Sequence, residues 1–241
     1  MIKRACRDLL CVLVGALRQN RHSKVLFYHD VHSEKLYTDM STHISLFLDH
    51  VSMIRKLGYE IVSEITQPTN QIMICFDDGF RGILDNKSFF IEQNIHPTIF
   101  VAVDLIGKQG YLSIEEIKQL QIDGFIFQSH GWSHYNMTKF SVEELHRELK
   151  GAKNALENMI GAEMSAICFP QGYYSDVVLR MSCEAGYKRM YISEPSPYLL
   201  SESHGIISRY LVQDVSPAIL KGILNGGMDI WQSHYHKLHK Q

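Results

Sequence analysis

Two adjacent carboxylates, groups that can bind cations or move protons, stand at the end of an apolar segment. Asp77 and Asp78 follow the apolar run 72–76 and precede Gly79. Successive side chains of a strand point to opposite faces, so at the end of a strand the two carboxylates can serve different partners. Asp-Gly is also common turn chemistry, so this pair alone would be interpreted as a polar strand-to-loop turn.

Two histidines four residues apart, His130 and His134, form a second group. If their segment is helical, both imidazoles lie on one face and are close enough to share one ion. Imidazole is the usual nitrogen ligand of zinc and similar metals. The chain contains 13 histidines, so a pair at this spacing also arises by chance. The pair therefore indicates a metal site only in combination with other groups.

A third segment, 168–174, places Pro170, Gln171 and Gly172 in a loop. Proline and glycine shape such a loop, and its backbone N–H groups could face a reacting oxygen. A simple turn explains the same residues equally well. The meaning of all three segments therefore depends on whether the fold brings them together.

Short apolar runs alternate with longer periodic runs along the chain, which predicts an α/β fold with a mostly parallel sheet. The expected strands are 24–28, 71–76, 97–103, 124–128, 165–169, 188–192 and 206–212. Helices are expected over 43–57 and 176–185, and after the capping-box patterns that begin at Ser113 and Ser141. With 241 residues and no linker, the chain suits one large domain, which we expect to cover residues 24–225.

Two arrangements of this sheet are compatible with the pattern, a β/α barrel and an open doubly wound sheet. The polar residues that follow the carboxyl ends of expected strands are His29-Asp30, Asp77-Asp78, His130 and Pro170-Gln171-Gly172. A barrel gathers such ends onto one face, where barrel enzymes keep their active sites. An open sheet would bring together only the ends near a switch point. Because these polar residues follow strands that are far apart in the sequence, their positions favour a barrel.

The order and spacing of these motifs resemble the polysaccharide deacetylase family, also called the NodB-homology domain or carbohydrate esterase family four. The shared pattern is Phe-Asp-Asp-Gly at 76–79, Ser-His-x-x-Ser-His at 129–134 and Phe-Pro-x-Gly at 169–172. Segments 27–31, 57–60, 97–101 and 184–187 also look like family segments in family order, so the likeness covers roughly residues 24–212. Tyr28-His29-Asp30-Val31 looks most like the poly-N-acetylglucosamine deacetylases.

The resemblance implies a distorted, incomplete (β/α) barrel that uses one divalent metal ion, with zinc expected. It implies a hydrolase that removes N-acetyl groups from the amino sugars of a polysaccharide, oligosaccharide or glycolipid. The implied residues are the catalytic base Asp77, the metal ligands Asp78, His130 and His134, and the oxyanion loop Pro170, Gln171, Gly172 and Tyr173. In this assignment the backbone N–H of Gln171 is the oxyanion donor.

Further residues are expected at the pocket beside this centre. His29 and Asp30 follow the first expected strand, and Trp132 and Tyr173 could form a wall on which a sugar ring stacks. Aromatic side chains beside a site more often pack than serve as such a platform.

The chain departs from the family pattern at two places. Many members carry an arginine two residues before the proline, where it pairs with the base, but this residue is Cys168 here. Arg209 matches another recurrent family arginine, for which a structural role is expected. The family histidine that protonates the leaving amine has no clear counterpart. The alternatives are His29, His204, His234, His236 and His239, although 226–241 is expected to be a solvated, His-rich tail.

Composition and charge constrain partners and location. The formal net charge of −2 leaves no basic footprint for nucleic acid, and no oligomeric state is predicted. The five cysteines form no CxxC pair, as expected for reduced thiols in a cytoplasmic or membrane-peripheral protein. Residues 1–23 could be a leader, or an amphipathic helix that packs on the domain or lies at a membrane surface. Their apolar run, 9–17, is too short to span a bilayer.

Two other functions are alternatives to N-acetyl-sugar hydrolysis. One is deacylation of another amide or ester on the same metal scaffold. The other is a non-catalytic glycan-binding domain that has kept the barrel. The complete set of two aspartates and two histidines argues against the second alternative.

Overall fold

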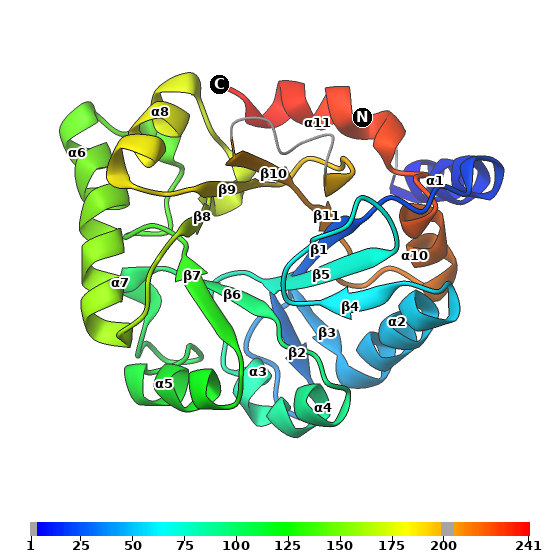
Figure 1. Cartoon of the computed structure of the whole chain (residues 1–241), viewed down its shortest axis with the longest axis horizontal. Helices are drawn as coiled ribbons and strands as arrows, with labels where there is room; N and C mark the ends of the chain where they lie inside the picture. The colour runs from blue at the N-terminus through cyan, green and yellow to red at the C-terminus, as the bar shows by residue number, and fades with distance from the viewer. Residues whose placement is uncertain (1–3, 199–204) are drawn as a thin grey trace.

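A nearly closed parallel barrel forms the centre of the molecule (Figure 1). The structure is a computed structural model that describes residues 4–198 and 205–241. Around the barrel the strands are β11 (Tyr210–Leu211), β1 (Lys24–Tyr28), β5 (Gln71–Phe76), β6 (Thr98–Val101), β7 (Ile126–Ser129), β8 (Ala166–Cys168), β9 (Arg189–Ile192) and β10 (Ile206–Ser208). One seam, between β10 and β11, is not sealed by strand pairing. The predicted distorted (β/α) barrel is confirmed, and the open doubly wound sheet is wrong.

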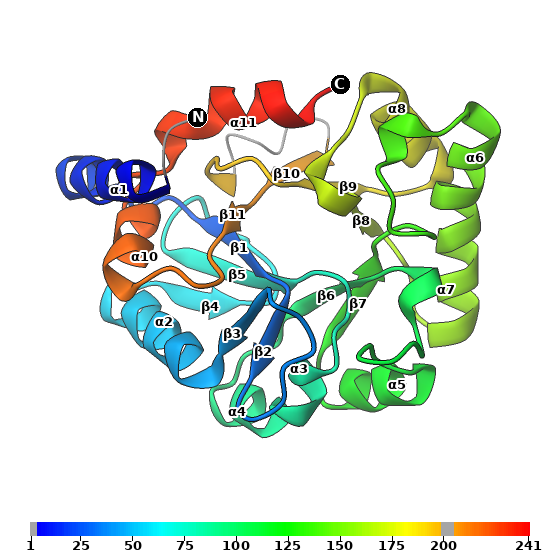
Figure 2. The ribbon, with the colours of Figure 1, turned by 180° about the vertical axis from the view of Figure 1, so that it is seen from behind.

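Helices surround the barrel on its outside, as the front and back views show (Figures 1 and 2). They are α1 (Arg4–Arg18), α2 (Ile44–Lys56), α3 (Gly82–Asp85), α4 (Lys87–Glu92), α5 (Ile114–Ile122), α6 (Val142–His146), α7 (Ala152–Ile160), α8 (Asp176–Ala185), α10 (Pro217–Leu224) and α11 (Gln232–His239). Short strands β2 (Asp30–His32) and β3 (Ser41–His43) pair with each other, and β4 (Glu60–Val62) pairs with the start of β5.

The barrel strands are apolar on both faces because helices cover one face and the barrel interior the other. In β1, Val25 and Phe27 belong to the interior cluster, whereas Leu26 and Tyr28 pack outward beneath the helices. This alternation is the two-residue period of a strand. It leaves room for polar side chains only where the strands end.

Local signals set the helix boundaries as the sequence predicts. Ser113 and Ser141 each accept a hydrogen bond from the third residue of the helix they open, and the glutamate there bonds back, so both capping boxes are complete. Helix α8 ends at Gly186, whose φ of +97° is the left-handed conformation that glycine adopts without strain.

Helix α1 packs against α10 through two glycines that bring the helix backbones close together. A Cβ added at Gly222 would lie 2.9 Å from the Cys11 carbonyl oxygen, and one added at Gly15 would lie 2.6 Å from the Gly222 carbonyl oxygen. Helix α1, near the start of the chain, therefore packs directly on α10, near its end. No helix of the described residues is long and apolar enough to cross a membrane.

Replacing Gly222 by alanine is expected to destabilise this contact. Alanine has the higher helix propensity, but its methyl group would meet backbone atoms of α1 that cannot move independently. We expect a loss of about 1–3 kcal/mol in the free energy of unfolding, measured by urea denaturation. Gly151→Ala is the matched control, because a Cβ there meets only side-chain atoms at 3.6 Å or more. Equal stability of the two variants would contradict the packing described for α1.

The segment 226–241, expected from the sequence to be a solvated tail, is helical near its end and contacts the loop that follows β8. It forms α11, which reaches the loop that follows β8, and the Tyr174 N–H donates to the His239 carbonyl oxygen over 3.1 Å. The Tyr174 hydroxyl donates to Glu194 Oε1 over 2.6 Å, and His236 Nδ1 lies 3.2 Å from the other oxygen of this carboxylate. The histidine-rich composition hides these contacts, because most side chains of α11 remain exposed.

Candidate active site

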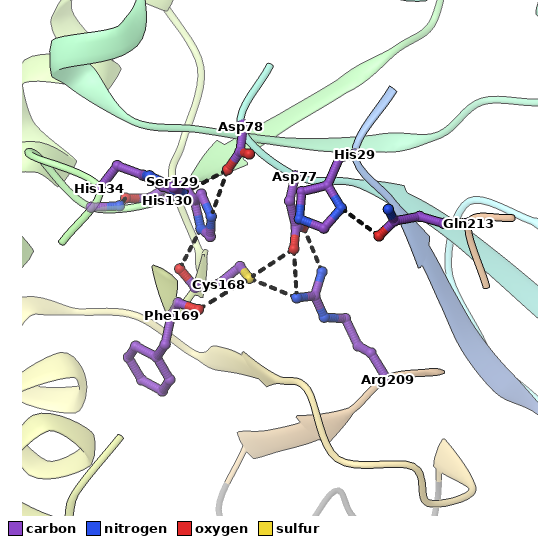
Figure 3. A network of polar contacts seen from close by, with 11 residues as sticks. His29, Asp77, Asp78, Ser129, His130, His134, Cys168, Phe169, Arg209 and Gln213 are labelled. Carbon is purple, nitrogen blue, oxygen red and sulfur yellow. Dashed lines mark hydrogen bonds and ion pairs between the residues drawn. The ribbon is translucent and has the colours of Figure 1, made fainter. Parts of the chain in front are cut away.

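The chemically distinctive side chains meet at the carboxyl ends of the barrel strands (Figure 3). Asp77 and Asp78 follow β5, His130 follows β7, His29 follows β1, and Cys168 ends β8. They line a common pocket with a volume of about 360 Å³, apart from Cys168, which lies behind Asp77. The barrel therefore brings these strand ends together at one pocket.

Asp78, His130 and His134 form a compact cluster. Asp78 Oδ1 lies 3.2 Å from His130 Nε2 and 2.8 Å from His134 Nε2. One potential ligand atom from each residue lies within 4.8 Å of those of the other two. Asp78 and His130 are buried, whereas His134 is partly exposed toward the pocket. The three groups therefore face one point at which a single ion can be held.

The hydrogen bonding of His130 shows that this point suits a cation. His130 Nδ1 lies 2.7 Å from the Cys168 carbonyl oxygen, which can only accept, so Nδ1 carries the proton. In the neutral ring Nε2 then presents a lone pair to Asp78 Oδ1, the buried oxygen that also lies next to His134 Nε2. Two facing lone pairs repel each other unless a positive ion lies between them. A backbone carbonyl that orients the outer nitrogen is also the usual support of a metal-binding histidine.

The two histidines do not converge through a helix, which was the geometry considered from their spacing. Residues 130–134 form a loop in which Gly131 and His134 have φ values of +79° and +63°. Among the described non-glycine residues with positive φ are Asp78 at +71°, His134 and Gln171 at +58°. Backbone strain of this kind persists where the surrounding structure enforces it, commonly at functional sites.

A buried glutamate holds the histidine loop in place. Glu148 Oε2 accepts hydrogen bonds from the backbone N–H groups of Trp132 and Ser133, over 3.1 and 3.0 Å. Glu148 lies in a π-helical segment, Arg147–Gly151, between α6 and α7. Such a widened turn is frequent at functional sites. Sequence reasoning missed this residue, because a glutamate inside a charged helical stretch looks solvent-exposed.

Arg209 forms a bidentate ion pair with Asp77. Its Nη1 and Nη2 atoms lie 2.6 and 2.9 Å from the two carboxylate oxygens, and Nη2 lies 2.8 Å from Cys168 Sγ. Burial alone would raise the pKa of Asp77, but the guanidinium outweighs it and holds the pKa below its ordinary value. Asp77 is thus an ionised carboxylate that lies next to the Asp78/His130/His134 cluster but is not one of its members.

Arg209, for which a structural role is expected from the sequence, reaches Asp77 from an interruption in the barrel wall. It stands between β10 and β11, at the unsealed seam, and interrupts the single strand predicted over 206–212. Its guanidinium carbon lies 4.1 Å from the Phe27 ring centre inside the barrel. The positive charge that is missing at position 168 is therefore supplied from position 209.

The loop after β8 borders the same pocket. Pro170–Gly172 form a single tight turn, and Gln171 and Gly172 line the pocket, whereas Pro170 is buried beneath it. Tyr173, expected as part of a sugar-stacking wall, packs edge-on against His239, with ring centres 5.7 Å apart, and is not among the residues that line the pocket. His239 itself lines the pocket.

Two residues predicted at the pocket lie elsewhere. Asp30 is fully buried, with its carboxylate against Gly82, because side chains alternate after β1 and only His29 faces the pocket. Trp132 stacks beneath the Arg147 guanidinium, 4.7 Å from the ring centre, on the outer side of the histidine loop. Neither position could be read from the sequence, since Asp30 directly follows His29 and Trp132 lies between the two histidines of the cluster.

A parallel α/β barrel with an Asp/His/His cluster and a separate, arginine-paired carboxylate at its strand ends is the setting of a hydrolytic site. The sequence model of the polysaccharide deacetylase family matches residues 64–190, more than half of the chain. The chain belongs to the polysaccharide deacetylase family, and the resemblance noted from the motifs is confirmed.

Solved structures share the fold. The Streptococcus pyogenes deacetylase PplD, solved in complex with acetate, superposes with a TM-score of 0.74 and 18% identity, covering 84% of this chain and 98% of that one. IcaB from Ammonifex degensii gives a TM-score of 0.72 and 18% identity over 86% of this chain and 99% of IcaB. In sequence, YxkH of Bacillus subtilis is 22% identical over 206 residues, which cover 81% of this chain and 72% of YxkH.

Proposed function

We propose that the protein is a metal-dependent hydrolase that removes N-acetyl groups from the amino sugars of a glycan or glycolipid. The observation that carries this proposal is the convergence of Asp78, His130 and His134 on one point, with the ionised Asp77 beside it. Two histidines and one carboxylate leave coordination positions open on a zinc ion, as a catalytic metal requires. Zinc is the ion we expect there.

Each residue has a defined task in this reaction. A divalent ion held by Asp78, His130 and His134 would polarise the acetyl carbonyl and activate water. Asp77 accepts the proton of the water that attacks the carbonyl carbon, and Arg209 keeps it ionised until then. The Gln171 N–H, which lies at the pocket, donates to the oxygen that becomes negative. The C–N bond then breaks, and acetate and a free amine leave.

His29 is the residue that we assign to protonation of the leaving amine. It follows β1 directly across from Asp77, because Tyr28 pairs with Phe76. Gln213 Nε2 donates to the Met40 carbonyl oxygen over 3.1 Å, so its Oε1 faces His29 Nδ1 at 2.9 Å and requires a proton there. This arrangement leaves Nε2 as the atom that can carry a proton to the substrate.

His29→Gln is expected to slow amide hydrolysis by roughly 10²–10⁴-fold, the usual contribution of a general acid or base. Hydrolysis of an aryl acetate should fall by less than about tenfold, since a phenolate leaves without protonation. The measurement is kcat on both substrates, with the exposed His146→Gln as the matched control. Equal losses on the amide and the aryl ester would rule out His29 as the acid.

Acetate release from a panel of N-acetylglucosamine oligomers tests the proposed function itself. The protein should release acetate, lose this activity after chelation and regain it with added zinc. Oligomer binding without acetate release would favour the glycan-binding alternative. Hydrolysis of other acylated amides or esters, without acetate release from the oligomers, would favour the alternative that the protein deacylates a different amide or ester.

A further inference from the structure

Helix α1 turns an apolar face toward solvent. Leu9, Leu13 and Leu17 recur every four residues, so they lie on one side of the helix, and they are 62%, 54% and 87% exposed. The opposite side carries Cys11 and Gly15, which are buried against α10. A helix that packs on a domain normally faces its apolar side inward. The outward leucines therefore lack a partner within the described part of the chain.

The charge at this end of the molecule identifies the kind of surface that complements it. Helix α1 packs on α10 and contacts α11 through Arg7, which donates to the Tyr235 hydroxyl (Figures 1 and 2). Residues 4–18 and 217–241 carry six basic side chains, Arg4, Arg7, Arg18, Lys221, Lys237 and Lys240, against the acidic Asp8 and Asp229. The whole chain, by contrast, has a net charge of −2. A cationic helix with one apolar face suits the interface of an anionic lipid leaflet.

The pocket extends from the Asp/His/His cluster to these same helices. Beyond the polar site its walls are apolar, and we call this part the apolar arm, formed by Leu211, Val215, Ile219, Ile223 and Met228. Arg7 and Asp8 of α1 and Tyr235 of α11 border it. A sugar ring needs hydrogen-bonding partners, which this arm does not offer, whereas a hydrocarbon chain gains free energy by leaving water there.

We propose that the amino sugar which the enzyme deacetylates is carried on a membrane lipid. Helix α1 lies in the leaflet interface with its leucines inward, and the arginines and lysines of the surrounding helices contact anionic headgroups. The apolar arm receives the first part of the lipid chain while the N-acetyl group reaches the cluster. This substrate class rests on the proposed deacetylase function, whereas membrane binding can be measured without it.

Binding to lipid vesicles tests whether the leucine face of α1 contacts a membrane. The probe is vesicles of phosphatidylglycerol and phosphatidylcholine, with bound protein measured by sedimentation. Leu13→Glu combined with Leu17→Glu should weaken binding by at least roughly tenfold, because each buried leucine contributes more than that factor. The matched control is Ile122→Glu with Val142→Glu, which alters exposed aliphatic side chains on α5 and α6, away from α1. The control should bind vesicles like the parent protein.

Acetate release from two substrates tests the lipid-carried sugar. One is an N-acetylglucosamine oligomer on an alkyl lipid in the same vesicles, and the other is the free oligomer. The Leu13/Leu17 variant should lose turnover of the vesicle substrate and keep turnover of the free oligomer, since these leucines lie outside the pocket.

Three results would overturn the proposal. The first is a parent protein that does not bind vesicles or does not favour the lipid-linked substrate. The second is a dimeric parent protein that the Leu13/Leu17 substitutions convert to a monomer. The leucine face of α1 would then join two copies of this chain. The third is absence of acetate release from both substrates, which refutes the deacetylase function and with it the substrate class.

Discussion

Asp77→Asn is expected to retain its metal ion and to lose roughly 10²–10⁴-fold in turnover, whereas Asp78→Ala is expected to lose both metal and activity. Asn matches the shape of Asp77 but cannot accept a proton from water. Asp77 contacts Arg209 and lies outside the Asp/His/His cluster, so its loss should leave the ion in place. Asp78 supplies the only carboxylate of that cluster.

The measurement is metal content and acetate release for both variants beside the parent protein. Each variant is the control for the other, since the two residues are adjacent and chemically identical. A simple Asp-Gly turn predicts changes in stability alone and equal turnover per folded molecule. Full turnover by Asp77→Asn, or metal loss as complete as in Asp78→Ala, would show that the two roles are assigned wrongly.

Arg209→Met is expected to be the most destabilising single substitution at the site. It would leave the Asp77 carboxylate buried without its bidentate partner, and breaking a buried ion pair typically costs about 3–5 kcal/mol. The base would also lose the charge that keeps it ionised, so turnover should fall in the molecules that remain folded. Urea unfolding and acetate release measure the two effects separately.

The double variant Asp77→Asn/Arg209→Met distinguishes an ion-pair effect from simple loss of packing. Without the carboxylate no buried charge is left unpaired, so much of the lost stability should return while activity stays low. Arg180→Met is the matched control, because Arg180 is exposed and its contact with Glu184 should be worth less than about 1 kcal/mol. Double-variant stability no better than that of Arg209→Met would mean that the arginine stabilises the barrel by packing alone.

The sequence predicts the fold where an element has a strong local signal. The strands over 24–28 and 71–76 and the helix over 176–185 have the predicted bounds, because continuous apolar runs and clear end signals define them. The short strands β2, β3 and β4 were missed, since three residues are too few for a periodic pattern. The break between β10 and β11 was missed because an arginine inside an apolar run looks like a strand residue.

For the site, motif order was enough to bring together Asp77, Asp78, His130 and His134. It could not predict partners that come from distant positions, such as Arg209 for Asp77 or Gln213 for His29. Such pairs depend on how the barrel closes, and no local pattern encodes this. Trp132 was assigned to the pocket wrongly for the same reason, because its direction depends on the loop that Glu148 fixes.

The seam of the barrel also determines when the enzyme becomes complete during its synthesis. A chain emerging from the ribosome supplies Asp77 early, but Arg209 follows only after seven of the barrel strands, β1 and β5–β10, have been made. Until then Asp77 has no buried cation, and the carboxylate favours an open, hydrated arrangement over a closed ring. The last part of the barrel therefore supplies both its final strand and the cation that keeps Asp77 ionised. A chain that stops before residue 209 would lack both the final strand and the cation that pairs with Asp77.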